Sequence, residues 1–293
     1  MPGTLGGLVR DEEEAMPVIS VVWGLGLLAA IALSLLWSGN MSYSLVRNSL
    51  EVATINATVE AAVNRAVVGL LDTQPERRWR ADGTAQNFEF GAIPIRVSIQ
   101  DELGRIDLNQ AEEPVFVGLL QSAGLDLNSA TSLADKILDW RTTTSLKHLN
   151  GAKEPEYRAS GSAFRPRNGP FQSVDELLLV MDMTPALFRR IEPALTVYSG
   201  RQFIDPQVAP REALQALPNM TPDTVESALA ARRLEQLAVD RSAAVDSVAS
   251  LRGRAFTIRT EFQMSNRTLH YQAAVRLTDN PNQPFWLLSW KTK

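Results

Sequence analysis

The longest hydrophobic run lies near the N-terminus, where residues 16–37 read MPVISVVWGLGLLAAIALSLLW and carry no charge. A helix needs about 20 mostly apolar residues to span a bilayer, so this run predicts a transmembrane helix. The apolar region of a secretory signal peptide is shorter and follows a basic flank, whereas the flank here is RDEEEA. The pattern therefore favours a membrane helix over a discarded signal peptide.

A helical pattern continues beyond this run. Residues 40–71 contain no proline, and their apolar residues recur at helical spacing until DTQPE at 72–76. Two arrangements fit this pattern. One is a membrane anchor followed by a separate amphipathic helix, and the other is a single rod whose second half packs on a globular domain.

The next segments predict strands and then helices. Residues 87–109 alternate like two short strands around a turn. Helix starts then follow at Asn128 and Thr184, which suit N-caps, and at Ser173, which makes a capping box with Glu176. The expected helices are 112–123, 128–141, 173–181 and 184–192.

The rest of the chain completes an α+β fold class. Residues 142–172 form a long loop rich in Gly and Pro, of the kind that is functional, ligand-bound or disordered. Two short helices are expected at 211–217 and 221–236. After them the C-terminus predicts three antiparallel strands with turns near Asn266 and Asn280. The α+β segments therefore bracket an all-helical insert.

Charge and composition exclude several classes of function. The net charge is −4, of which residues 1–15 contribute −3, so the remaining 278 residues sum to −1. Such a body lacks the basic footprint of a nucleic-acid binder. The absence of cysteine excludes disulfides and thiolate metal sites.

The sequence contains little that supports a catalytic function. The two histidines, His148 and His270, belong to no hydrolase, phosphate-loop or dinucleotide motif. Asp135 and Asp139 share a helix face, but basic neighbours favour a solvated face over an acid/base pair. We therefore expect no enzyme.

A calcium ion is the one cofactor that the sequence suggests. Calcium binds six to eight oxygen atoms on a bent loop. Around the long loop, Asp139, Glu154 and Glu156 are the candidate carboxylate ligands, with Asn150 nearby. The alternative is a loop held by its own packing.

A weak internal repeat resembles helix-hairpin-helix units. MDMTPALF at 181–188 and PNMTPDTV at 218–225 place similar residues at a helix start. Such units bind nucleic-acid phosphates through backbone N–H groups at their turns. Here the turns carry Asp182, whose charge opposes a phosphate, and Asn219. A structural use is favoured, and a membrane-anchored DNA-binding protein remains the alternative function.

Several stretches together resemble one family. DWR followed by NGAKEPEY, then FRPRNGPFQSVDELLLVMDMTPALFRRIEPALTVYSGRQFID and APREALQALP, resemble the minor pseudopilin K subunit of bacterial type II secretion. The likeness runs from the N-terminal helix, including SVVW, through about Pro218.

The resemblance implies a pseudopilin fold with a long N-terminal transmembrane helix, an antiparallel sheet and an inserted all-helical domain of helix-hairpin-helix or SAM-like type. It divides the chain into a leader at 1–15, a transmembrane helix at 16–37, its periplasmic continuation at 38–72, α+β parts at 73–109 and 200–293, and the helical insert at 110–199.

The family is not enzymatic and supports export of folded proteins. The resemblance implies a place at the pseudopilus tip with the minor pseudopilins I and J. Further implied partners are the major pseudopilin, the prepilin peptidase and the inner-membrane assembly platform, with no nucleic acid. The location would be the bacterial inner membrane, with the C-terminal domain in the periplasm.

Three departures from the family pattern concern specific residues. Leaders of the family normally end in Gly, whereas this register places the cleavage between Ala15 and Met16. Ser20 then stands at the fifth mature position, where pseudopilins generally carry Glu, and we interpret it as tip-determining. Some members bind calcium, but residues 142–144 are Thr where others continue with aspartates.

Overall fold

The computed structural model describes residues 10–74, 76–237 and 248–292, with side chains left undescribed at 10–19, 35–45, 235–237 and 249. The chain divides into two compact units, residues 1–58 and 59–293. Helix α1 runs from Arg10 to Leu70 without a break. Of the two arrangements that the sequence left open, the structure has the single continuous helix.

Within the described part of the chain, no helix combines the length and the apolar character needed to cross a membrane. The predicted span 16–37 extends at both ends into positions whose side chains lie outside that part.

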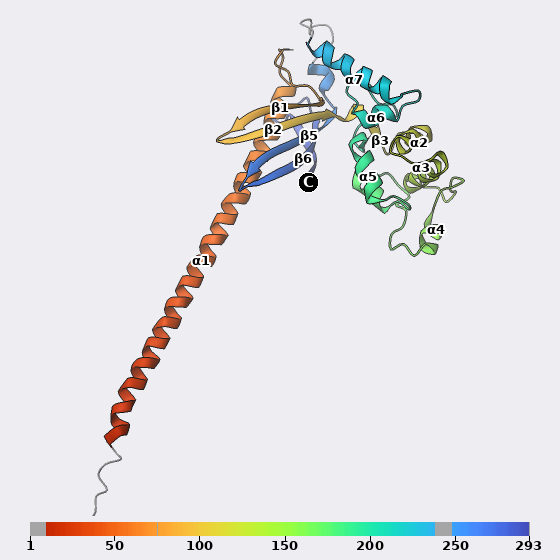
Figure 1. Cartoon of the computed structure of the whole chain (residues 1–293). Helices are drawn as coiled ribbons and strands as arrows, with labels where there is room; N and C mark the ends of the chain where they lie inside the picture. Colours follow the sequence, from red (N-terminus) through yellow and green to blue (C-terminus); the bar gives the residue numbers. More distant parts are fainter. Residues whose placement is uncertain (1–9, 75, 238–247, 293) are drawn as a thin grey trace, which may run out of the picture. The chain divides into compact units, whose positions relative to one another are not determined.

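The second unit contains a five-stranded antiparallel sheet (Figure 1). Its strands, in spatial order, are β1 (Asp82–Phe90), β2 (Ile93–Asp101), β5 (Ala255–Met264), β6 (Arg267–Leu277) and β7 (Phe285–Thr292). The turn between β5 and β6 contains Ser265 and Asn266, both with positive φ, as the turn near Asn266 predicts. All three predicted C-terminal strands are therefore present.

The C-terminal part of α1 covers one face of this sheet. Its buried residues recur every three or four positions and are Val59, Ala62, Val63, Ala66, Val67 and Leu70. Trp79 fixes the contact, because its backbone N–H donates to the carbonyl of Gly69 at 2.8 Å and its ring lies 6.3 Å from that of Phe88 on β1. Phe88 pairs with Ile95, so α1 covers the face that carries Ile95.

A helical part lies between β2 and β5 in the sequence. It contains α2 (Glu113–Ser122), α3 (Leu127–Arg141), α4 (Glu154–Ala159), α5 (Pro185–Ile191), α6 (Arg211–Gln215) and α7 (Pro222–Leu237). Two short strands, β3 (Ile106–Asp107) and β4 (Leu195–Thr196), pair in parallel where the chain enters and leaves the first helices. One continuous buried core runs through these helices, from Ile106 to Val225.

The hydrogen bonds at the helix N-termini can be compared with the predicted capping residues. Thr184 caps α5 by accepting from the N–H of Leu187 at 3.2 Å, which confirms that prediction. Asn128 is not a cap, because Asp126 accepts from the N–H groups at the start of α3. The capping box at Ser173 is also wrong: residues 174–179 form a 3-10 helix, and Glu176 accepts from the N–H of Gln172 instead.

We predict that Gly69→Ala destabilises the second unit. A Cβ at this position would lie 2.5 Å from two carbon atoms of the Trp79 ring, so the ring must move. Overpacking of this kind costs about 1–3 kcal/mol, more than the roughly 1 kcal/mol that alanine gains over glycine in a helix. Denaturant unfolding measures the difference.

The matched control is Val68→Ala on the same helix turn, where the side chain is 62% exposed. It should change the free energy of unfolding by less than about 0.5 kcal/mol. Equal stability of Gly69→Ala and the wild type would contradict the proposed Trp79 contact.

Candidate interaction surface

Strand β7 forms one edge of the sheet and presents large apolar side chains to solvent. Trp286 is 54% exposed, Leu287 52% and Trp290 39%. The sequence PFWLLSW places apolar residues on both faces of the strand. A lone exposed leucine is ordinary, but exposed tryptophans on an edge strand are typical of a binding surface. Trp290 and Leu287 lie on one face of the sheet, and Trp286, which pairs with Arg276, lies on the other.

Two of these side chains extend the face that α1 covers. Trp290 pairs with Ala273, which pairs with Ile258, which in turn pairs with Ile99. The inner members of this row are at most 1% exposed, whereas Trp290 at its end is not covered. Leu287 ends the neighbouring row in the same way.

The width of the sheet explains this exposure. Five strands spaced about 4.8 Å apart span about 19 Å, whereas a helix is about 10 Å wide. Because Trp79 holds α1 toward the β1 side, that helix leaves the β7 side of the face open. Trp290 and Leu287 therefore remain exposed beside the covered part of the face.

The predicted calcium ligands lie around the long loop but are engaged with separate partners. The carboxylate of Asp139 is fully buried and lies 2.7 Å from the ring Nδ1 of His148. Glu154 accepts from Arg158 at 2.7 Å, and Glu156 accepts from Lys147 at 2.7 Å. The described residues include no group of three His, Asp or Glu side chains that could hold a metal ion.

The loop instead surrounds a cation from the chain itself. The ammonium of Lys153, a residue only 6% exposed, donates to the carbonyls of Asp139 at 2.6 Å and Thr142 at 2.7 Å. It also donates to Oδ1 of Asn168 at 3.1 Å. Burial lowers the pKa of Lys153, and the Asp139 carboxylate opposes that shift. Three oxygen atoms from separate parts of the loop thus converge on one positive charge.

Aromatic packing completes the base of the loop. The Trp140 ring lies 5.9 Å from the ring of Tyr157 and 6.2 Å from that of Phe171. Burial raises the pKa of Tyr157 to about 12, so its phenol stays protonated while it accepts from the N–H of Met181 at 2.9 Å. The loop is therefore held by its own packing. Calcium binding stays a prediction, which unfolding in chelator and in millimolar calcium would test.

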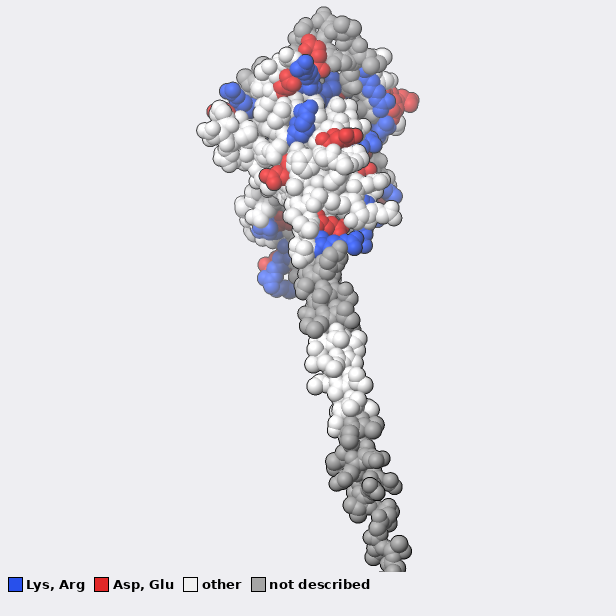
Figure 2. Space-filling view, turned by 90° about the vertical axis from the view of Figure 1, so that its left-hand side faces the viewer, with Lys and Arg blue, Asp and Glu red and all other residues white. Residues whose placement is uncertain are grey.

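The two turns of the weak internal repeat have the left-handed backbone that Asp and Asn tolerate. Asp182 has φ of 67° and Asn219 has φ of 64°, both in the left-handed region. The Asp182 carboxylate forms an ion pair with Lys136 of α3. Figure 2 shows basic and acidic residues intermingled on the visible face, which fits the near-neutral charge of the body.

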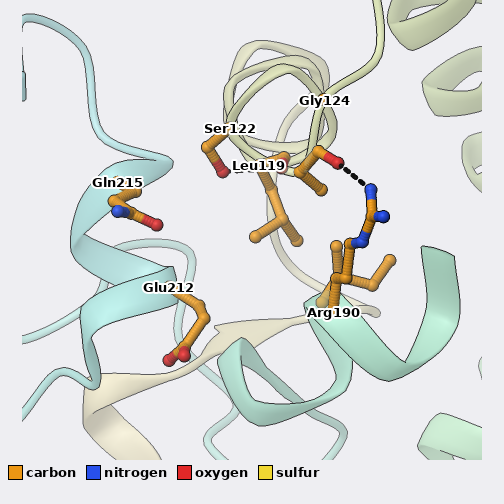
Figure 3. A pocket seen from close by; sticks show the side chains of 8 residues that line it. Leu119, Ser122, Gly124, Arg190, Glu212 and Gln215 are labelled. Atoms are coloured by element: carbon orange, nitrogen blue, oxygen red, sulfur yellow. Dashed lines mark hydrogen bonds between the residues drawn. The ribbon is translucent and has the colours of Figure 1, made fainter. Parts of the chain in front are cut away.

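Two shallow grooves flank Arg190 of α5. The first, of about 350 Å³, lies among α2, α5 and α6 (Figure 3). Arg190 there donates to the carbonyl of Ala123 at 3.0 Å, while Glu212 and Gln215 line the opposite wall. The second groove, of about 630 Å³, is lined by α3 and α5 and includes the Lys136–Asp182 pair. Charges of both signs line each groove, and neither gathers a catalytic set.

The N-terminal candidate residues all lie in α1. Ala15 and Met16 belong to its first turns, and their side chains lie outside the described part. Ser20 is described and exposed. The cleavage site and the role of Ser20 stay predictions.

Sequence reasoning missed the residues that define these surfaces. The role of Lys153 depends on acceptors at three distant positions, so no local pattern reveals it. The exposed strand had a usable signal, because apolar residues on both faces of a terminal strand conflict with a solvated edge.

Comparisons with known proteins find a match for the central residues. Residues 98–200 match the family model described as type II secretion system (T2SS), protein K. A curated relative, type II secretion system protein K of Klebsiella pneumoniae, is 33% identical over 79 residues. That stretch is 27% of this chain and spans about a quarter, 24%, of the relative's length.

A solved structure shows a similar fold. A chain from the crystal structure of the GspK-GspI-GspJ complex of the enterotoxigenic Escherichia coli type 2 secretion system aligns with a TM-score of 0.60. The alignment covers 85% of this chain and 99% of that chain at 17% identity. Together the comparisons confirm the resemblance to the K proteins of type II secretion.

We predict that Lys153→Met destabilises the second unit by about 2 kcal/mol or more, because three carbonyl oxygen atoms lose the ammonium that donates to them and each loss of a buried partner costs about 1–3 kcal/mol. The control is Lys147→Met, whose side chain is 45% exposed in its pair with Glu156. Exposed pairs contribute less than about 1 kcal/mol. Urea unfolding and protease nicking of the loop are the measurements, and equal effects of the two substitutions would contradict the buried-cation role.

Proposed function

From the relationship to the type II secretion K proteins, we propose that this chain is a non-enzymatic minor pseudopilin of that system. Its partners are the minor pseudopilins I and J, and its task is to support export of folded proteins. The mixed helix and antiparallel sheet, with α1 packed against one face, supports this proposal. So does the similar solved structure, because that crystal holds K, I and J chains in one complex.

The observation that carries the proposal is the uncovered end of the α1 face at β7. Trp290 and Leu287 continue a buried row of the core but are themselves exposed. A partner that supplies an apolar helix or strand would extend this core. Such a surface serves assembly, because it offers large apolar area without groups for chemistry.

The N-terminal segment fits the same assembly. Residues 16–37 anchor the chain in the inner membrane before assembly and are kept afterwards, with the second unit in the periplasm. Cleavage between Ala15 and Met16 removes the acidic leader. N-terminal mass spectrometry of the membrane-extracted protein tests the cleavage site.

Ser20 supports a place at the pseudopilus tip. A charged group in a bilayer is tolerated mainly when it is paired, and a serine hydroxyl cannot neutralise the N-terminal amine of a neighbouring subunit. This chain can offer its own amine to a neighbour's Glu but cannot accept one in return. Such one-sided pairing suits a terminal subunit.

We predict that Trp290→Ser lowers the yield of the I and J pseudopilins that copurify with this chain by at least about tenfold, because truncating a buried tryptophan at an interface costs about 2 kcal/mol or more. The chains are coexpressed and purified through a tag on this one. The control is Phe203→Ser, which removes a side chain that is 78% exposed outside the sheet. Unchanged yield for Trp290→Ser would reject β7 as the partner surface.

We also predict that Ser20→Glu allows the subunit to enter the shaft. The new carboxylate can pair with the N-terminal amine of another subunit, so labelled protein should appear along pseudopili and secretion should fall. Ser20→Ala is the control and should keep the wild-type position. Tip-only placement of the Glu variant with normal secretion would show that Ser20 does not set the position.

A further inference from the structure

Hydrogen bonds to two buried carboxylates hold the backbone of the loop after α3. Asp139, fully buried, accepts from the N–H of His148 at 3.2 Å as well as lying against its ring. Asp135, only 4% exposed, accepts from the N–H of Asn150 at 3.0 Å. Together with the Lys153 ammonium, these bonds fix the backbone on both sides of residue 149.

This fixed backbone presents apolar side chains to solvent. Leu149 is 92% exposed and Leu146 80% exposed, and the nearby Phe164 is 53% exposed. Leu149 lies between the two bonded residues His148 and Asn150, so it cannot turn inward without breaking their bonds to the buried carboxylates. Burial of a leucine side chain is favourable, yet both leucines are left exposed to solvent.

Basic residues lie close to these apolar residues in the sequence. Arg158 and Arg165, whose side chains are 76% and 73% exposed, share the single carboxylate of Glu154. Lys147, between the two leucines, pairs with Glu156. Residues 141–169 contain six Lys or Arg against two Glu, so the stretch has an excess of positive charge.

The same short helix joins these segments. Glu154 and Glu156 both belong to α4, and their ion pairs bring the segment with Leu146 and the segment with Phe164 to that helix. Figure 1 shows α4 at the end of the helical part that lies away from the strands. We define the loop surface by the three charged residues of these ion pairs, Lys147, Arg158 and Arg165, and the exposed apolar residues next to them in the chain, Leu146, Leu149 and Phe164.

We propose that the loop surface binds a protein segment that carries leucine-sized side chains next to carboxylates. The partner's apolar side chains cover Leu146 and Leu149, and its carboxylates pair with Arg158 and Arg165, which have one Glu between them. A protein partner fits better than an anionic membrane, because a protein can place its carboxylates at Arg158 and Arg165 alone, whereas a layer of lipid headgroups would also face Glu154 and Glu156. This site is independent of the partner surface at β7.

The test uses the full chain and a labelled synthetic peptide of alternating Leu and Glu, with a Leu and Lys peptide as its charge-reversed counterpart. Fluorescence anisotropy should show that the acidic peptide binds at least about tenfold more tightly than the basic one, and more weakly as salt rises. Leu146→Ser/Leu149→Ser should weaken binding by about tenfold or more. Arg165→Gln should make the affinity for the acidic peptide depend less on salt concentration.

The control is Phe203→Ser, exposed outside the loop surface, which should bind as the wild type does. Unfolding midpoints of all variants establish that the fold is kept. Absence of binding, or equal binding by the leucine variant, overturns the proposal. Binding of the detergent-solubilised chain to immobilised anionic phospholipid, lost in the leucine variant while the peptide fails to bind, would overturn it in favour of a membrane contact.

Discussion

The parallel pairing of β3 with β4 is the contact on which the arrangement of the second unit depends. Ile106 pairs with Leu195 and Asp107 with Thr196, so the chain leaves for the first helices and returns at neighbouring points. The Asp107 carboxylate, only 2% exposed, accepts from the N–H groups of Asn109 and Gly200 at 2.8 Å each. The pairing thus closes the segment that contains α2 to α5, and α6 and α7 follow it before the chain reaches β5, the neighbour of β2 in the sheet.

The sequence predicted most elements of the fold but few of the contacts that join them. Periodicity located the long helix, the C-terminal strands and most helices, because each buries one face at a regular spacing. It missed α4, a helix of six residues inside a loop rich in Gly and Pro, and the two-residue strands β3 and β4. The sequence also misplaced two capping interactions. Asp126, and not Asn128, accepts from the N–H groups at the start of α3, and Glu176 accepts from the N–H of Gln172 and not from that of Ser173.

The candidate surfaces were harder to foresee, for a physical reason. Whether Trp290 is buried depends on how far across the sheet α1 reaches, and Trp79 and Gly69 decide that from another part of the chain. The sequence marked the loop at residues 142–172 as a candidate site because of its length and its acidic residues. The buried charge that holds the loop together is nevertheless that of Lys153. Its ammonium donates to oxygen atoms that only the folded chain brings together.

The place of β5 beside β2 also sets an order of events during synthesis. The N-terminal hairpin of β1 and β2 emerges first, but the strand that pairs with β2 follows only after every helix of the insert. Until then the inner edge of β2 is unpaired, and an open strand edge invites association with other chains. Closing so long a loop is also slow compared with forming the local helices. A chaperone that shields β2 until the C-terminal strands arrive would therefore act on the most vulnerable intermediate of this chain.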